Sequence, residues 1–414
     1  MRSGFLWAVV GGLVGVVLAL TLQRPIEHWL NQREQSTKQI NQLLASAEND
    51  RATFTETGFN SSIDKYNSVS SRPGPIRAIA LQGLSRTYSD WTALRFRLGL
   101  SRGSYPDKAL TYALRAAAVA PKDVYTELAI AHAYQALGRY SNERAAAKAK
   151  VIELLDHKYS DAGVQFELNY LDWISAASND GKSFPDRLDP NNVANVRVLV
   201  DAGMDLAERG RKSTSPQRDQ YLKRASEFCN RAVLVQPGNQ VGSFCLGYVA
   251  MVLDNKLEAI RQYGLAVQGT SEFPRAHNNL GFIYAGDGQF SAAAEQFDAA
   301  VKTLDAPTTS LGLWLYNLGA AYLESSANDK AISVWRRAAE LPGAGDSYPT
   351  EWGLAMSYYI GNKPQNALEH YRRAVELASK ENINLTDIHA FEQSNAGPRE
   401  LAIARQLITM SMLH

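Results

Sequence analysis

The sequence predicts an all-α protein, a solenoid of stacked helix-turn-helix units that follows one N-terminal transmembrane helix. Three observations predict this fold. A four-part signature returns four times between Val241 and Leu377, amphipathic Ala-rich segments run from Leu43 to Met412 with few strand signals, and Phe5 to Leu22 carry no charge. Repeat arrays grow without one large core, which suits a chain of 414 residues.

The signature is a Leu-Gly pair, an Ala thirteen residues after the Leu, an aromatic residue four later and a second Ala three later again. The opening pairs are Leu246-Gly247, Leu280-Gly281, Leu318-Gly319 and Leu354-Ala355. The triplets that follow are Ala259, Tyr263 and Ala266; Ala293, Phe297 and Ala300; Ala331, Trp335 and Ala338; and Ala367, Tyr371 and Ala374. Residues at i, i+4 and i+7 share a helix face, so each triplet predicts one buried stripe between closely packed helices.

The spacing inside each copy is constant, whereas the spacing between copies is 34, 38 and 36 residues. The extra residues fall around 306–308 and 343–345, in connections where insertions cost little. Upstream, two further groups indicate the second helices of degenerate repeats: Ala225, Cys229, Ala232 and Pro237; and Ala109, Ala113, Ala116 and Pro121.

These residues resemble the tetratricopeptide repeat (TPR) family, whose pattern runs W-x2-L-G-x2-Y, then A-x3-F, then a late Pro. The match is strongest from Pro274 to Pro307, and Ala355 departs from it in the last copy. The resemblance implies a right-handed superhelix. In it, the first helices of successive repeats would line a concave groove for a protein partner.

The breaks in the pattern divide the chain. Pro73 and Pro75 interrupt an early helix, the period is lost between Ser160 and Ser215, and Pro398 suits the first turn of a final helix. We therefore expect a membrane anchor at 1–23, a helical stalk at 24–56, degenerate repeats at 57–160, an irregular helical insert at 161–215, repeats at 216–380, and a loop with a capping helix at 381–414.

The uncharged segment from Phe5 to Leu22 is just long enough to cross a bilayer as a helix. Arg2 also gives it the positive start of a cleaved signal peptide, but no A-x-A site follows. The short N-terminal tail favours a cytoplasmic N-terminus, whereas Arg24, Arg33 and Lys38 argue for the opposite orientation. We expect an extracytoplasmic repeat domain, with a cytoplasmic one as the alternative.

Small residues within this segment suggest helix packing in the membrane. Gly11 and Gly15 form G-x-x-x-G, extended by Ala19, and such faces let transmembrane helices self-associate or dock to a partner. The same spacing also arises by chance in Gly-rich spans. A homo-oligomer is therefore one of two interpretations.

Other residues point away from catalysis. The chain has 43 basic and 42 acidic residues, so it lacks the excess of positive charge that is typical of nucleic-acid-binding proteins. None of the seven His has another His or Cys at metal-ligand spacing, and no phosphate-loop, nucleophile-elbow or dinucleotide motif is present. We expect no enzyme activity, metal or cofactor.

Cys229 and Cys245 are the only cysteines, one on the second helix of a repeat and one on the first helix of the next. In an oxidising compartment they could form a disulfide between packed helices. Alternatively, they are two small buried apolar residues.

The TPR resemblance also implies which side chains line the groove. These are Arg275, Asn278, Asn279 and Phe282 in one copy, Tyr316, Asn317 and Leu323 in the next, and Trp352, Met356 and Tyr359 in the last. Family members use Asn at the Asn279 and Asn317 positions to bind a peptide backbone, and only Arg275 is present to clamp a carboxylate. Alternatively, several of these residues pack against a neighbouring repeat.

The leading hypothesis is a membrane-anchored scaffold or assembly factor that holds a peptide or helix of a partner protein in this groove. The alternative is a structural subunit of a larger membrane complex that uses its convex face and its transmembrane helix.

Overall fold

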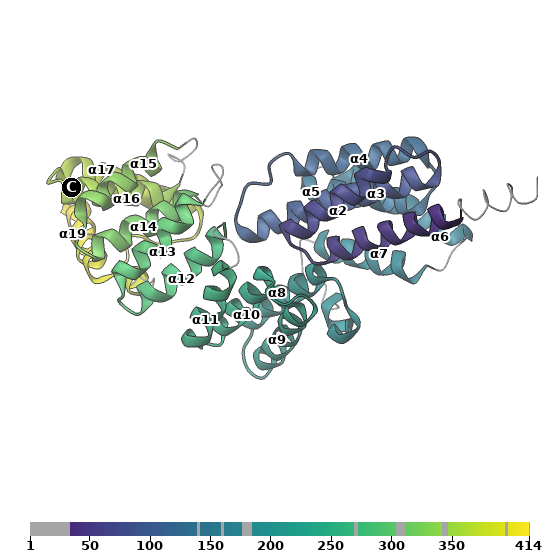
Figure 1. Ribbon diagram of the computed structural model, residues 1–414. Helices are drawn as coiled ribbons and strands as arrows, with labels where there is room; N and C mark the ends of the chain where they lie inside the picture. Colours follow the sequence, from purple (N-terminus) through teal and green to yellow (C-terminus); the bar gives the residue numbers. More distant parts are fainter. Residues whose placement is uncertain are drawn as a thin grey trace, which may run out of the picture.

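The computed structural model describes residues 34–138, 141–158, 161–175, 184–268, 272–303, 311–341, 347–393 and 396–413. Within these ranges the regular elements are α-helices and two short 3-10 helices. The expected all-α class is confirmed. In Figure 1 helices α2 to α7 form one lobe and α12 to α19 another, with α8 to α11 between them.

The first lobe follows a helix at residues 34–52. Its helices are α2 (Glu56–Val69), α3 (Pro75–Leu98), α4 (Tyr105–Val119), α5 (Val124–Leu137), α6 (Ser141–Lys158) and α7 (Ala162–Ser175). The middle section comprises η1 (Phe184–Arg187), η2 (Pro190–Asn192), α8 (Val196–Lys212), α9 (Gln217–Val235), α10 (Gln240–Val252) and α11 (Lys256–Gln268).

The second lobe contains the clearest repeats and the C-terminal helices. These are α12 (Pro274–Gly286), α13 (Phe290–Lys302), α14 (Leu311–Glu324), α15 (Asn328–Ala339), α16 (Tyr348–Ile360), α17 (Pro364–Lys380), α18 (Ile388–Gln393) and α19 (Pro398–Leu413). Consecutive helices pack as hairpins, and the second helix of each hairpin packs on the first helix of the next.

The repeat signature has a direct steric explanation in these hairpins. A Cβ on Gly281 of α12 would lie 2.6 Å from the ring of Phe297 on α13, and one on Gly247 would lie 2.7 Å from the ring of Tyr263. Each glycine therefore leaves room for the aromatic ring of the paired second helix. The rings and the flanking alanines of all four triplets are buried, as the spacing predicts.

The first lobe and the middle section share one hydrophobic core. Phe54, Phe59 and Trp91 lie in the same cluster as Val196 and Phe244. Tyr170 and Val193, from the segment expected as an irregular insert, belong to the same cluster.

Polar contacts tie the same parts together. Asn239 accepts a hydrogen bond from Gly242 N at 2.9 Å, capping α10, and donates one to the carbonyl of Thr53 at 3.0 Å. Arg51, on the helix at residues 34–52, pairs with Asp90 of α3. The described part of the expected stalk thus packs on the array, with Ile40 and Ala47 buried against α2 and α3.

The expected membrane anchor lies outside the described residues. Across the ranges that are described, no helix combines the length and the apolar character needed to cross a bilayer. Gly11, Gly15 and Ala19 likewise fall outside these ranges.

The two cysteines lie at the junction of three helices. Cys229 on α9 and Cys245 on α10 are joined through their sulfur atoms. A Cβ on Gly203 of α8 would lie 2.6 Å from one sulfur and 2.8 Å from the other. Gly203 therefore allows α8 to lie directly against the disulfide.

Candidate functional site

Some of the α12 residues that were expected to line a groove pack inside the repeat array, and others are exposed. Asn278 is buried and accepts a hydrogen bond from Asn317 Nδ2 at 3.4 Å. Asn279 donates to the hydroxyl of Tyr263 at 3.0 Å. Phe282 is exposed and meets Phe297 edge-on, whereas Arg275 is half-buried against Phe96 of α3. Both amides are thus engaged within the array.

The expected groove residues on α14 and α16 are largely covered. Leu323, Trp352 and Met356 are buried, and Tyr316 and Tyr359 are half-buried. The first three share a hydrophobic cluster with the apolar residues of α18 and α19, against which Tyr316 and Tyr359 pack. The chain's own C-terminal segment therefore occupies this part of the groove, beyond the expected capping of the last repeat.

Glu400 of α19 is the polar centre of that contact. Its carboxyl accepts a hydrogen bond from Trp352 Nε1 at 2.8 Å and another from the hydroxyl of Tyr316. Burial raises the pKa of Glu400, although these two hydrogen bonds act in the opposite direction. The phenylalanine of α18, Phe391, packs beside Trp352 with ring centroids 5.1 Å apart.

The first turn of α19 is held by the end of α14. Glu324 accepts hydrogen bonds from the backbone N–H groups of Arg399 at 3.1 Å and of Glu400 at 2.8 Å. A carboxylate at this position also complements the positive end of the helix dipole. Arg399 donates in return to the carbonyl of Leu323 and to Asn328. The repeat pattern singles out neither Glu324 nor Glu400. The one local signal is Pro398, which predicts a helix start and therefore places Glu400 in the first turn of that helix.

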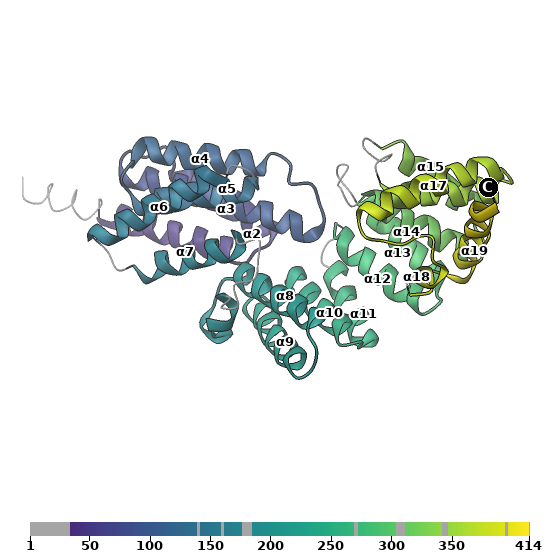
Figure 2. The ribbon, with the colours of Figure 1, turned by 180° about the vertical axis from the view of Figure 1, so that it is seen from behind.

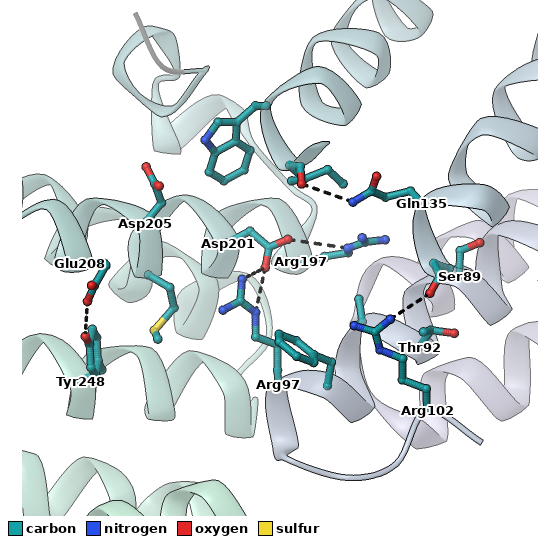
Figure 3. Close-up of a pocket in the computed structure, with 16 residues that line it drawn as sticks. Ser89, Thr92, Arg97, Arg102, Gln135, Arg197, Asp201, Asp205, Glu208 and Tyr248 are labelled. Carbon is teal, nitrogen blue, oxygen red and sulfur yellow. Dashed lines mark hydrogen bonds and ion pairs between the residues drawn. The ribbon is translucent and has the colours of Figure 1, made fainter. Parts of the chain in front are cut away.

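An open pocket of about 550 Å³ lies on the first-helix face, the face formed by the first helices of successive hairpins. It lies between the first lobe and the middle section (Figure 3). The residues that line it come from α3, α5, α7, α8 and α10 and the loop after α3. They are Ser89, Thr92, Ala93, Phe96, Arg97, Arg102, Gln135, Ala136, Trp173, Ile174, Arg197, Asp201, Met204, Asp205, Glu208 and Tyr248.

Ion pairs hold the walls of this pocket in place. Arg97 of α3 donates to Asp201 of α8 at 2.6 and 3.1 Å. Arg197 of α8 pairs with Asp90 of α3, and Tyr170 of α7 donates to Asp201 at 2.7 Å. Because these charges are buried, their hydrogen bonds specify how α3 and α8 meet.

Charges of both signs face the pocket. Figure 3 shows Asp205 and Glu208 along α8 on one side and Arg102 on the other. Glu208 accepts a hydrogen bond from the Tyr248 hydroxyl at 2.7 Å. A hydrogen bond from Arg211 is the main cause that lowers the pKa of Glu208 to about 2, so this carboxylate is ionised at neutral pH. The sequence pattern marks none of these pocket residues, because all of them except Tyr248 come from the segments where the repeat pattern is weakest.

Comparisons with known proteins bear on the fold alone. No family model and no curated protein matches the chain. Among solved structures, MamA from Desulfovibrio magneticus RS-1 is 15% identical and covers 44% of this chain and 97% of its own, with a TM-score of 0.35.

Two other solved structures have comparable levels of identity. YrrB, described as a TPR protein with an unusual peptide-binding site, is 17% identical over 45% of this chain and 88% of its own, with a TM-score of 0.34. A human IFIT1 dimer with PPP-AAAA is 14% identical over 78% of this chain and 70% of its own, with a TM-score of 0.49.

Proposed function

We propose that this protein is a membrane-anchored TPR-like scaffold that binds a segment of a protein partner on its first-helix face. The observation that carries the proposal is the open pocket between α3 and α8, lined by aromatic, aliphatic and charged side chains. Partner segments bind in such hollows through apolar anchors surrounded by polar contacts. The groove on α14 and α16 already contains α19, so the pocket is the site we assign to the partner.

The proposal includes an anchor at Phe5 to Leu22 and an extracytoplasmic repeat domain. The Cys229–Cys245 disulfide supports this location, because disulfides persist in oxidising compartments. A reporter fused after residue 414 tests the orientation. Activity of an alkaline phosphatase fusion is expected, and fluorescence of a green fluorescent protein fusion in its place would indicate a cytoplasmic domain.

The function is tested by filling the pocket. Met204→Trp adds an indole on the α8 wall, and Leu114→Trp adds one at an exposed position of α4 as a matched control. Crosslinking in native membranes, followed by mass spectrometry, should recover a defined partner with the wild type and with Leu114→Trp. Recovery should fall at least about tenfold with Met204→Trp, since losing a hot-spot anchor costs about 2 kcal/mol or more and about 1.4 kcal/mol is tenfold. Equal recovery from a folded Met204→Trp variant would exclude the pocket.

A second candidate function is that of a structural subunit. Leu234 on α9 and Leu257 on α11 are 71% and 84% exposed, and exposed leucines on second helices favour a contact outside the first-helix face. This candidate predicts a fixed large assembly in detergent that Leu257→Asp disrupts and Met204→Trp leaves intact.

A further inference from the structure

Three pocket residues, Phe96, Arg97 and Arg102, form a basic and aromatic cluster with Arg275 of α12, and these four residues are called the Phe96 rim. The side chain of Phe96, near the end of α3, is 47% exposed. The guanidinium carbon of Arg102 lies 5.3 Å from its ring centroid, and that of Arg275 on α12 lies 5.2 Å from it. Two cations thus contact one exposed ring.

Positive charge at this rim is only partly compensated. Arg97 pairs with Asp201. Among the described residues, no carboxylate forms an ion pair with Arg102 or Arg275, and Arg102 donates only to the carbonyl of Ala136, at 3.5 Å. Burial, and then the charge of Arg97, lower the pKa of Arg275 to about 10. Removing a guanidinium from water without a partner is unfavourable, and an anion placed beside it would offset that cost.

The rim gathers more positive charge than the sequence pattern indicates. Arg275 is the one cation among the residues expected to line the groove. The fold brings Arg97 and Arg102 to it, because the end of α3 packs against α12. A Cβ on Gly99 would lie 3.3 Å from Cβ of Arg275, so the backbone of α3 reaches this side chain directly.

We infer that the Phe96 rim binds the acidic side chains of an extended protein segment, whose neighbouring apolar side chain enters the pocket beside Trp173 and Met204. The inference rests on the proposed function and specifies the partner's chemistry. Carboxylates match the paired N–H groups of Arg102 and Arg275. On the opposite wall Asp205 pairs with Arg209, and Glu208 pairs with Arg211 and Lys212, so the cations of that wall are already matched by carboxylates. The rim alone is small and fits a short acidic stretch better than a long polyanion such as RNA.

The test is fluorescence anisotropy with the full chain in detergent. The probe is a labelled, C-terminally amidated peptide of repeating Glu-Glu-Phe units. Comparison ligands are the same peptide with Gln in place of Glu, and a single-stranded oligoribonucleotide of equal charge. The variant Arg102→Gln/Arg275→Gln removes both charges but keeps polar side chains, and Arg337→Gln at an exposed position of α15 is the control.

The wild type and Arg337→Gln should bind the acidic peptide equally. The double variant should bind it about 30-fold more weakly, which corresponds to about 1 kcal/mol for each of two partly exposed ion pairs. The Gln peptide should bind the wild type with a similar deficit. This pattern would support the inference.

Other outcomes would overturn it. The first is equal affinity of the wild type and the double variant for the acidic peptide. The second is tighter binding of the oligoribonucleotide than of the acidic peptide. The third is that a Gln peptide with a free C-terminus binds the wild type as tightly as the acidic peptide does. A lower melting temperature of the double variant with unchanged peptide affinity would show that the arginines only join α3 to α12. If native partners are still lost with Met204→Trp, the proposed function stands while this inference fails.

Discussion

The first-helix face contains two regions that differ in what fills them. Between α3 and α8 it is an open pocket whose walls are joined by buried ion pairs. Over α14 and α16 it is covered by α18 and α19 (Figure 2). The open region mixes charged side chains with apolar ones, whereas the covered one presents Leu323, Trp352 and Met356. Apolar surface of this kind is costly to leave in water, so the chain itself covers it.

The largest effect is expected from breaking the ion pairs behind the open pocket. Asp90 is buried and pairs with both Arg51 and Arg197. Asp90→Ala leaves two buried guanidiniums without this partner and should lower the free energy of unfolding by about 3–5 kcal/mol. Urea denaturation measures it, and Asp107→Ala at an exposed position should change stability by less than about 0.5 kcal/mol. A similar loss in both variants would mean that the ion pairs do not hold the pocket.

The disulfide beneath α8 should have the next largest effect. It closes a loop with a sequence separation of 16 residues, which corresponds to about 3 kcal/mol of stabilisation. Cys229→Ser/Cys245→Ser should therefore lower the melting temperature, and reductant should do the same to the wild type alone. Mass spectrometry without reductant should find no free thiol. Two free thiols would contradict both the disulfide and the proposed compartment.

The third largest effect is expected from substituting a repeat glycine in the covered region. A Cβ on Gly319 would lie 2.7 Å from Cδ1 of Trp335, a buried ring. Gly319→Ala should thus destabilise the protein by about 1–3 kcal/mol through overpacking. Gly264 on α11 has open space around it, so Gly264→Ala should instead stabilise by about 0.5–1 kcal/mol. Effects of the same sign in thermal denaturation would refute the steric explanation.

These sites also show what a sequence can predict. The glycine and the ring that it accommodates, such as Gly281 and Phe297, belong to one hairpin, so their spacing is readable along the chain. The contact of Arg275 with Phe96, or of Glu400 with Trp352, depends on how hairpins far apart in sequence curve toward one another. No local pattern encodes that curvature. The repeat was therefore predictable, whereas the composition of the pocket and the occupant of the groove were not.

The smallest effect is expected at Glu400, where the covered groove meets α19. Glu400→Gln keeps an acceptor for Tyr316 and Trp352, so below pH 4.5, where Glu400 is protonated, stability should change by less than about 1 kcal/mol. Burial raises the pKa of Glu400 in the folded state above its ordinary value of 4.5, so the folded state binds the proton more tightly. This contribution is fully present below pH 4.5 and is lost as pH rises through the raised pKa.

The stability of the wild type relative to Glu400→Gln should therefore fall as the pH rises from about 4.5 through the raised pKa. Urea denaturation across that range measures the difference, and Glu153→Gln, at an exposed position of α6, should show no such slope. A flat difference would mean that water reaches the carboxyl and that α19 seals the groove less tightly than its contacts indicate. The covered region would then resemble the open pocket, and both would be accessible to a partner.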